Sequence, residues 1–135
     1  MCLRPIETKF KKERKGVVQK LKADKIRFGS FGIQALDMGI LTAEHIEITR
    51  QIISKRIKNC GKLWIRVFPK IPITRKSVAV RMGRGKGNVS AWIAKISRGT
   101  ILYEIEGINH TQAEEILKQI SIKLPVGVAL IEVLR

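Results

Sequence analysis

A basic, glycine-rich stretch has the composition best suited to ligand binding. It holds three alternating glycines and three cationic side chains in the run Arg81-Met82-Gly83-Arg84-Gly85-Lys86-Gly87-Asn88. Glycine accepts positive φ and lets a backbone approach a ligand closely, and clustered Arg and Lys side chains attract phosphate. No acidic residue occurs between residues 61 and 100 to balance these cations. The run therefore predicts a phosphate-binding loop, with a solvated hairpin between two strands as the alternative.

The same residues do not predict a P-loop for nucleoside triphosphates. Such a loop requires Ser or Thr directly after its Gly-Lys pair, and a helix that begins there to hold the phosphates. Here Lys86 is followed by Gly87 and Asn88, and a strand is predicted next. The residue that would bind magnesium and the helix N-terminus are both missing.

The ionisable residues are not spaced as a catalytic group. His45 and His110 are single histidines near predicted helix starts, so we expect them to be surface or capping residues. Glu104 and Glu106 lie two apart on a predicted strand and share one face, where carboxylates are usually solvated. We therefore predict a protein that is not an enzyme, with no cofactor and no bound metal.

The cysteines and the N-terminal residues indicate the cellular compartment of the protein. Cys2 and Cys60 lack the spacing of a zinc site or a disulfide framework, which favours a reducing compartment. No apolar stretch approaches the ~20 residues of a membrane span, and the start lacks the apolar region of a secretory signal. The basic start, from Arg4 to Lys15, could belong to an organellar transit peptide. It contains Glu7 and Glu13, however, whereas transit peptides are poor in acids. We therefore expect a soluble protein that is not secreted.

Positive charge is segregated along the chain. The 135 residues include 27 Lys and Arg against 11 Asp and Glu, a formal charge of +16. Residues 1–30 carry a net +7 and residues 61–100 a net +10, whereas residues 31–60 carry +1 and residues 101–135 carry −2. Charge that only serves solubility is usually of mixed sign. The pattern predicts a basic surface that binds a polyanion.

The low aromatic content narrows the kind of polyanion. Aromatic residues make up only 5% of the chain, which disfavours a stacking platform for single strands. Trp64 and Trp92 lie in predicted strands, where we expect core packing with base stacking as the alternative. Recognition through phosphate, ribose and shape is typical of folded, helical RNA, so structured RNA is the predicted partner.

Two amphipathic helices are predicted. Thr42 can cap a helix that continues to about Asn59. Thr111 and Glu114 form a capping box for a second helix, which Pro125 ends. Apolar residues follow helical spacing in both, at Ile46, Ile53 and Ile57 in the first and at Ala113, Ile116, Leu117, Ile120 and Leu124 in the second. Each helix should pack one face on a sheet.

Alternation with period two predicts the strands. They fall at Lys62–Phe68, Ser77–Met82, Val89–Ile96, Ile101–Glu106 and Val128–Leu134, with an edge strand at Lys25–Leu36 broken by Gly29 and Gly32. Residues 1–24 carry too few apolar groups to pack and are predicted to be an extended arm that orders on a partner. The predicted fold is α+β: residues 25–135 form a single-domain sandwich of mainly antiparallel strands with two helices packed on it, preceded by the basic arm.

Several motifs occur in a familiar order. The longest are Arg27-Phe28-Gly29-Ser30-Phe31-Gly32, Gly61-Lys62-Leu63-Trp64-Ile65-Arg66-Val67-Phe68-Pro69 and Val80-Arg81-Met82-Gly83-Arg84-Gly85-Lys86-Gly87-Asn88. Shorter ones are Thr8-Lys9-Phe10-Lys11-Lys12, Pro72-Ile73-Thr74, Ile101-Leu102-Tyr103-Glu104 and Lys123-Leu124-Pro125. Over nearly the whole chain, the sequence resembles the L-sixteen family of bacterial-type large-subunit ribosomal proteins, organellar members included.

The resemblance implies a structural constituent of the large ribosomal subunit. It implies partners in large-subunit rRNA, A-site tRNA, the 5S rRNA region and neighbouring ribosomal proteins, and entry late in subunit assembly. It implies rRNA contacts of the basic arm at Lys9, Lys11, Lys12, Arg14 and Lys15. The two basic stretches, residues 1–30 and 61–100, predict further rRNA contacts at Arg27, Lys62, Arg66, Arg75 and Lys76. It also implies a loop near the tRNA and the peptidyl transferase centre at Arg81, Met82, Gly83, Arg84, Gly85, Lys86, Gly87 and Asn88.

The chain departs from the family pattern at several places. Lys70 stands where many members have Asp, Ser90 and Ala91 replace an acidic and an aromatic residue, and Val126-Gly127-Val128 lacks a basic residue. The family's contacts are not carried over there. The 21 isoleucines and the frequent lysine indicate an AT-rich genome, which favours an organelle or a reduced bacterium as the source.

Two other functions stay open at this point. An RNA-processing or tRNA-modifying enzyme would require a catalytic group, which the sequence does not show. A nucleoid-type DNA-binding protein would require a basic recognition helix. The first predicted helix has suitable residues in Arg50, Gln51, Lys55, Arg56 and Lys58.

Overall fold

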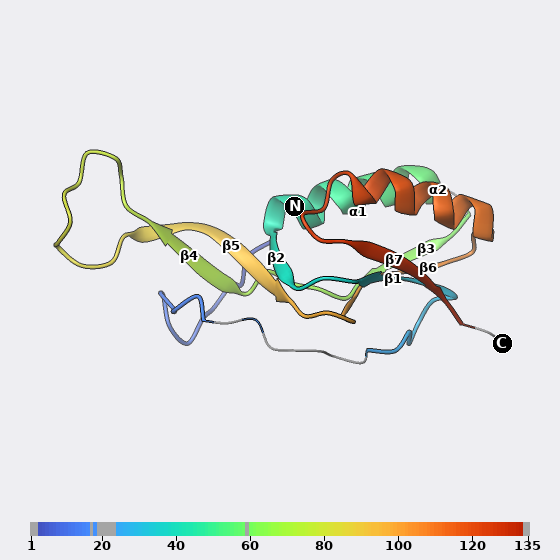
Figure 1. Ribbon diagram of the computed structural model, residues 1–135, viewed down its shortest axis with the longest axis horizontal. Helices are drawn as coiled ribbons and strands as arrows, with labels where there is room; N and C mark the ends of the chain where they lie inside the picture. The colour runs from blue at the N-terminus through green and yellow to red at the C-terminus, as the bar shows by residue number, and fades with distance from the viewer. Residues whose placement is uncertain (1–2, 17, 19–23, 59, 134–135) are drawn as a thin grey trace.

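A computed structural model of the chain describes residues 3–16, 18, 24–58 and 60–133. Within these residues seven strands form two antiparallel sheets. The first has the order β3-β6-β1-β7, formed by Lys62–Ile65, Ile101–Glu106, Phe31–Ala35 and Val128–Glu132. The second has the order β2-β5-β4, formed by Gly39–Thr42, Asn88–Ile96 and Ile71–Arg75. The β4–β5 ribbon extends away from the four-stranded sheet (Figure 1).

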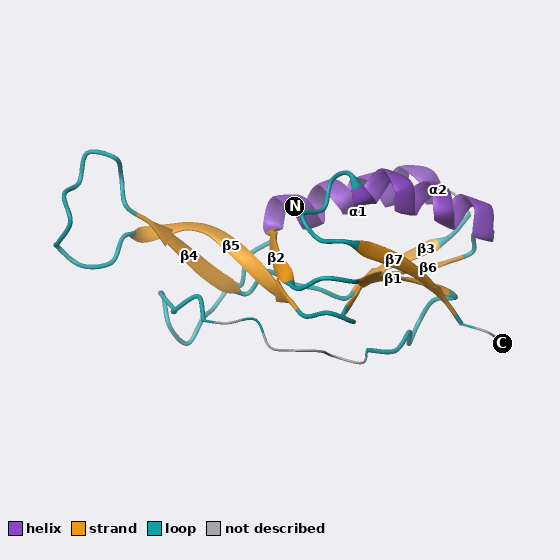
Figure 2. Ribbon diagram, in the orientation of Figure 1, coloured by secondary structure: helices purple, strands orange, loops and turns teal. Residues whose placement is uncertain are grey.

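Two helices cover one side of the four-stranded sheet (Figure 2). They are α1, Ala43–Ile57, and α2, His110–Ser121. Their predicted apolar faces are confirmed, because all are buried in the core except Leu117, which packs partly buried against it. The Tyr103 hydroxyl donates to the Ile46 carbonyl oxygen at 3.2 Å and so links β6 to α1. These features confirm the predicted α+β class with mainly antiparallel strands and two packed helices.

The start of α1 confirms the role expected of His45. Thr42 is the N-cap, and its hydroxyl accepts a hydrogen bond from the His45 N–H at 3.3 Å. The His45 Nδ1 atom in turn accepts from the Thr42 N–H at 3.3 Å. Both groups would otherwise be unsatisfied at a helix start, so this histidine serves the fold.

The predicted capping box of α2 is wrong by two residues. The N-cap is Asn109, and the Gln112 side chain accepts from the Asn109 N–H at 3.2 Å. Asn is among the best N-cap residues, and here it directly follows the turn at Gly107 and Ile108. Thr111 and Glu114 therefore lie inside the first turns of the helix instead of at its start.

The predicted edge strand at Lys25–Leu36 is also wrong. Only Phe31–Ala35 forms a strand, and β1 lies between β6 and β7 in the middle of the sheet. The preceding residues cross the sheet face that the helices leave open. A Cβ atom on Gly32 would lie 2.9 Å from the Ile26 side chain. The close approach of Ile26 explains why a glycine stands at position 32, and no sheet edge is needed to explain it.

The predicted strand Ser77–Met82 does not form. The strand before the loop is β4, and its ladder with β5 ends at the pair Arg75 and Asn88. Val78 and Met82 alternate as in a strand, but both side chains are fully exposed. The sequence pattern also missed β2 and β4, which are short strands without clear alternation.

The remaining predicted strands are confirmed with small changes at their ends. Lys62–Phe68 is shortened to β3, although Val67 is still buried. Val89–Ile96 and Ile101–Glu106 correspond to β5 and β6, and Val128–Leu134 corresponds to β7. Leu134, together with Asn59 and Cys2, lies outside the described residues.

The expectation that both tryptophans pack in the core is wrong. Trp64 and Trp92 are each partly exposed and neither belongs to the core cluster. Trp64 faces away from the helices on the edge strand β3 and stacks on Phe28. Trp92 lines a surface hollow together with Leu3 and Arg4. A strand position predicts burial only when the strand face is covered.

Candidate nucleic-acid interface

The glycine-rich loop consists of residues 76–87 and joins β4 to β5. It is the part of the ribbon that projects farthest from the helices in Figure 1. It surrounds an open hollow of about 490 Å³ whose lining includes the cations Arg75, Lys76, Arg84 and Lys86. Every cation of the loop is exposed. The loop is thus larger than a tight hairpin, and it presents backbone and positive charge together.

The loop backbone uses its glycines in two ways. Gly83 and Gly85 have φ values of 123° and 78°, which residues with a Cβ atom rarely adopt. Arg84 between them has a φ value of 51°. A Cβ on either glycine would meet no atom within 4 Å, so the need is conformational. At the base, a Cβ on Gly87 would lie 2.5 Å from the Arg75 carbonyl oxygen. There the glycine lets the two sides of the loop close.

The basic arm reaches the glycine-rich loop. The Lys12 ammonium donates to the Lys86 carbonyl oxygen at 3.0 Å, and the Lys86 ammonium donates to the carbonyl oxygen of Glu13. The arm cations of the predicted site are all exposed, namely Lys9, Lys11, Lys12, Arg14 and Lys15. Two cationic stretches more than 70 residues apart in sequence are therefore in contact.

The remaining predicted rRNA contacts divide into two groups. Arg27, Lys62, Arg75 and Lys76 are exposed. Arg75 and Lys76 lie at the base of the loop, where the Lys76 ammonium donates to the Gly83 carbonyl oxygen at 2.7 Å. Arg66 differs, because its side chain is only 14% exposed and is engaged in an ion pair.

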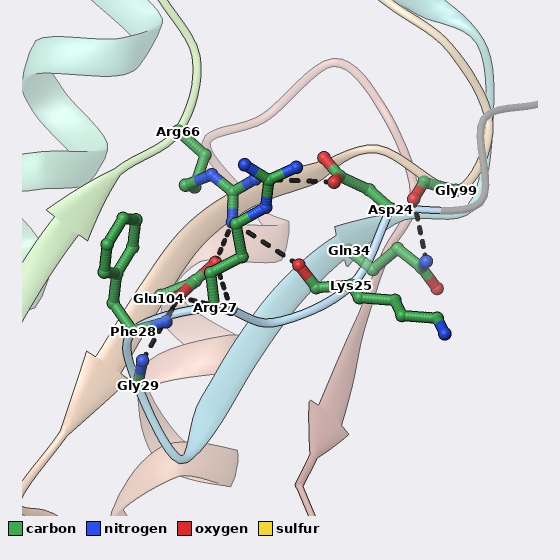
Figure 3. A network of polar contacts seen from close by, with 9 residues as sticks. All are labelled: Asp24, Lys25, Arg27, Phe28, Gly29, Gln34, Arg66, Gly99 and Glu104. Atoms are coloured by element: carbon green, nitrogen blue, oxygen red, sulfur yellow. Dashed lines mark hydrogen bonds and ion pairs between the residues drawn. The ribbon is translucent and has the colours of Figure 1, made fainter.

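Glu104 is buried and accepts several hydrogen bonds, a role that the sequence did not indicate. Its carboxylate is fully buried, although we expected it to be solvated. Its Oε2 atom accepts hydrogen bonds from the backbone N–H groups of Phe28 at 2.6 Å and Gly29 at 3.1 Å, and the Arg27 N–H lies 3.2 Å from both oxygens (Figure 3). Three consecutive backbone donors thus converge on one side chain.

The Arg66 guanidinium completes this network. One of its nitrogens donates to Glu104 Oε1, and another lies 3.4 Å from Asp24 Oδ1 (Figure 3). Burial by itself would raise the pKa of Glu104. The N–H donors of Phe28 and its neighbours, with Arg66, outweigh burial and hold that pKa below its usual value. The carboxylate therefore stays charged and fixes the segment before β1 onto the sheet.

The basic face of α1 is partly neutralised by acids. Arg50 forms a close ion pair with Glu47 at 2.7 Å, and hydrogen bonding to Arg50 lowers the pKa of Glu47 to about 2. Arg56 lies 3.9 Å from Glu115 of α2. These pairings occupy two of the residues that a DNA-recognition helix would use.

The described residues show neither a metal cluster nor a membrane helix. Among them, no three His, Cys, Asp or Glu side chains are grouped so that they could hold a metal ion. In the same part of the chain, no helix has the length and apolar character needed to span a bilayer. His110, near the start of α2, is exposed and lies 3.7 Å from Glu114.

Comparison with known proteins assigns the chain to a family. The chain matches the family described as Ribosomal protein L16p/L10e over residues 5–131. It is 48% identical over 125 residues to the large ribosomal subunit protein uL16 of Buchnera aphidicola subsp. Acyrthosiphon pisum (strain Tuc7), which covers 92% of each chain. It is 45% identical over 126 residues, again 92% of each chain, to the proteins of the same name from Dichelobacter nodosus (strain VCS1703A) and Thioalkalivibrio sulfidiphilus (strain HL-EbGR7).

The relatives also bear on two expectations from the sequence. All three are bacterial, so the preference for an organellar source gains no support. The family consists of structural components of the ribosome and not of enzymes, which agrees with the expectation of a non-catalytic protein. From the match over residues 5–131 and from these identities, the chain belongs to the ribosomal protein L16p/L10e family.

Proposed function

We propose that this protein is a structural constituent of the large ribosomal subunit that binds large-subunit rRNA and supports the A-site tRNA near the peptidyl transferase centre. The observation that carries the proposal is the joined cationic surface of arm and glycine-rich loop, held by the contacts between Lys12, Glu13 and Lys86. The names of the bacterial relatives support placement in the large subunit.

The arm and the loop suit different parts of this task. The arm cations are spread along an irregular segment, which fits a path along rRNA phosphates, and ordering such a segment costs entropy that RNA contacts offset. The loop projects beyond the domain, combines exposed cations with glycine backbone, and has no acidic residue. We assign residues 81–88, which are the second half of the loop and the first residue of β5, to the tRNA side and the arm to rRNA.

The other exposed cations extend the rRNA surface. Arg27 and Lys62 lie on the open face of the four-stranded sheet, and Arg75 and Lys76 lie at the loop base. In this proposal Arg66 acts mainly by positioning, because its guanidinium holds Glu104 and Asp24. Entry late in assembly and proximity to the 5S rRNA region are the finer parts of the proposal.

Sedimentation of the tagged protein from a cell extract tests the function. We expect it to comigrate with large subunits and whole ribosomes, and to be scarce in early large-subunit precursors. Protein that remains at the top of the gradient at physiological salt would exclude the proposal. Trypsin provides a separate test of the arm: cleavage after its exposed lysines should be fast in the free protein and slow in the subunit.

A further inference from the structure

An aromatic pair lies on the surface of the four-stranded sheet. The rings of Phe28 and Trp64 are stacked, with centroids 5.9 Å apart and planes 20° from parallel. Phe28 is 55% exposed, and Trp64 is also only partly buried. Leaving so much aromatic area in water forgoes the favourable free energy of burial. The pair is therefore a candidate contact surface.

The aromatic pair lies against the network of Glu104 and Arg66. The Phe28 N–H is bonded to the buried Glu104 carboxylate, and Trp64 lies directly opposite Glu104 in the ladder of β3 and β6. The Arg66 guanidinium carbon lies 5.9 Å from the centroid of the Phe28 ring, within range of a cation–π contact (Figure 3). The network thus holds the backbone of Phe28 and lies beside Trp64, and the two rings stack on each other without a partner molecule.

The surroundings of the pair are cationic. Arg27 precedes Phe28, and Lys62 lies two residues before Trp64 on the same face of β3; both are exposed. The nearby acids Asp24 and Glu104 are engaged with Arg66, and Glu106 lies opposite Lys62 in the ladder. An apolar side chain of a partner protein would bind the rings but would have no favourable interaction with these cations. A nucleotide would bind both, because its base can stack on the aromatic rings and its phosphates can pair with the cations.

We propose that Phe28 and Trp64 form a stacking site for one unpaired RNA base, with Arg27 and Lys62 holding the adjacent phosphates. The site rests on the proposed rRNA-binding function and adds a ligand class to it, an extruded nucleotide in addition to helical RNA. Composition alone argued against stacking because aromatic residues are few. The fold brings two of them together from positions 36 residues apart.

The test measures binding of the full chain to large-subunit rRNA transcribed from the same source. Phe28→Leu removes the aromatic ring and keeps an apolar side chain. Because stacking of a base on an aromatic residue typically changes affinity by about 5- to 150-fold, we expect the affinity to fall at least about fivefold. The dependence of log affinity on log salt should be unchanged, because no phosphate contact is lost.

Phe68→Leu is the matched control, because Phe68 is 48% exposed and lies outside the stacked pair. It should leave the affinity unchanged, and thermal unfolding should show that both variants fold. Normal rRNA affinity of Phe28→Leu, or equal weakening by both variants, overturns the stacking site while the wider function stands. A wild-type chain that does not bind rRNA overturns the proposed function itself.

Crosslinking with light at 254 nm identifies the occupant. We expect a nucleotide attached to Phe28 or Trp64 in reconstituted subunits, located by sequencing the modified peptide, and its loss in Phe28→Leu. Crosslinks that map only to other residues, or a ribosomal protein seated on the ring, would overturn the proposal.

Discussion

Glu104 and Arg66 form a buried ion pair that links β6 to the residues directly after β3. Both side chains also hold the segment leading into β1, because Glu104 accepts from the Phe28 N–H and Arg66 contacts Asp24. The Glu104 carboxylate is wholly inaccessible to solvent, and the Arg66 side chain is 14% exposed. Breaking a buried pair by removing one charge leaves the other uncompensated. This relationship yields two predictions about stability.

Glu104→Gln should destabilise the fold. The amide keeps the size of the side chain but loses the charge that Arg66 and three backbone donors require. We expect a loss of about 3 kcal/mol, toward the lower end for broken buried pairs because Asp24 still faces Arg66. Glu106→Gln, two residues along the same strand, is the control and should change stability by about 0.5 kcal/mol or less. Equal effects in urea unfolding would contradict the role of the network.

The contribution of Glu104 should be lost at low pH. Its pKa is lowered in the folded protein, so the unfolded chain, with a pKa of about 4.3, takes up protons first as pH falls. The stability it provides is complete above the unfolded pKa and disappears as pH falls through the lower, folded pKa. Urea unfolding of wild type and Glu104→Gln at pH 7, 5, 4 and 3 measures this. The difference between them should shrink at acid pH.

The difference in stability between wild type and Glu104→Gln is compared, because Glu47 also takes up a proton at acid pH. Its pKa is also lowered, to about 2, by its bond with Arg50, so both proteins lose that contribution equally. A difference between wild type and Glu104→Gln that is the same at pH 3 and pH 7 would show that the Glu104 charge does not stabilise the fold.

How far the sequence could predict the molecule depends on the range of the interactions. The isoleucine spacing of α1 and the apolar runs of β5 and β6 are local sequence patterns, and these elements were predicted correctly. Ser77–Met82 has the alternation of a strand, but no neighbouring element covers it, so it remains a loop. Periodicity predicts which residues could share a face and not whether that face is buried.

The network around Glu104 could not be predicted for a different reason. Its backbone donors lie 75 to 77 residues away in sequence, and Arg66 lies 38 residues away. A carboxylate two positions from another on a strand indicates solvent exposure unless the fold supplies donors. The sequence shows that residues 61–100, which include Arg66, contain no acidic residue. No local pattern, however, connects Arg66 with one particular glutamate. The cations of arm and loop were predicted as separate groups, and only the fold joins them.

The arm should carry a measurable share of the electrostatic affinity for rRNA. Each phosphate that a cation neutralises adds about 0.7–0.9 to the slope of log affinity against log salt. Lys9, Lys11 and Lys12 are all exposed, so replacing the three by Gln should reduce the slope by about 2–3 if each meets a phosphate. Binding to an rRNA transcript at 50–300 mM salt measures the change.

A variant of equal charge controls for the loss of net charge. Lys55, Lys58 and Lys123 are exposed and lie outside the arm and the loop, and their replacement by Gln should leave the slope nearly unchanged. If the two triple variants lower the slope equally, rRNA attraction depends on the total charge and not on the arm. A wild-type slope near zero would remove the electrostatic basis of the proposal.

Substitutions in the glycine-rich loop distinguish most directly between a functional surface and a solvated hairpin. Replacing Arg81, Arg84 and Lys86 together by Gln removes three exposed cations and no buried side chain. Thermal unfolding should therefore be nearly unchanged, because exposed substitutions usually alter stability by about 0.5 kcal/mol or less. Subunit incorporation should also persist, since the arm and the other basic residues still bind rRNA.

Binding of A-site tRNA to ribosomes that carry this loop variant should weaken by roughly tenfold, because each exposed charge pair contributes up to about 1 kcal/mol. The Lys86 ammonium also donates to the Glu13 carbonyl oxygen, so the variant loosens one link between loop and arm. The single variant Lys86→Gln measures the effect of losing this link. The double variant Arg81→Gln, Arg84→Gln measures the effect of the loop charge while the link is kept. Normal A-site tRNA binding by the triple variant at physiological salt would mean that the loop is only a solvated hairpin, and its assignment to the tRNA side would have to be abandoned.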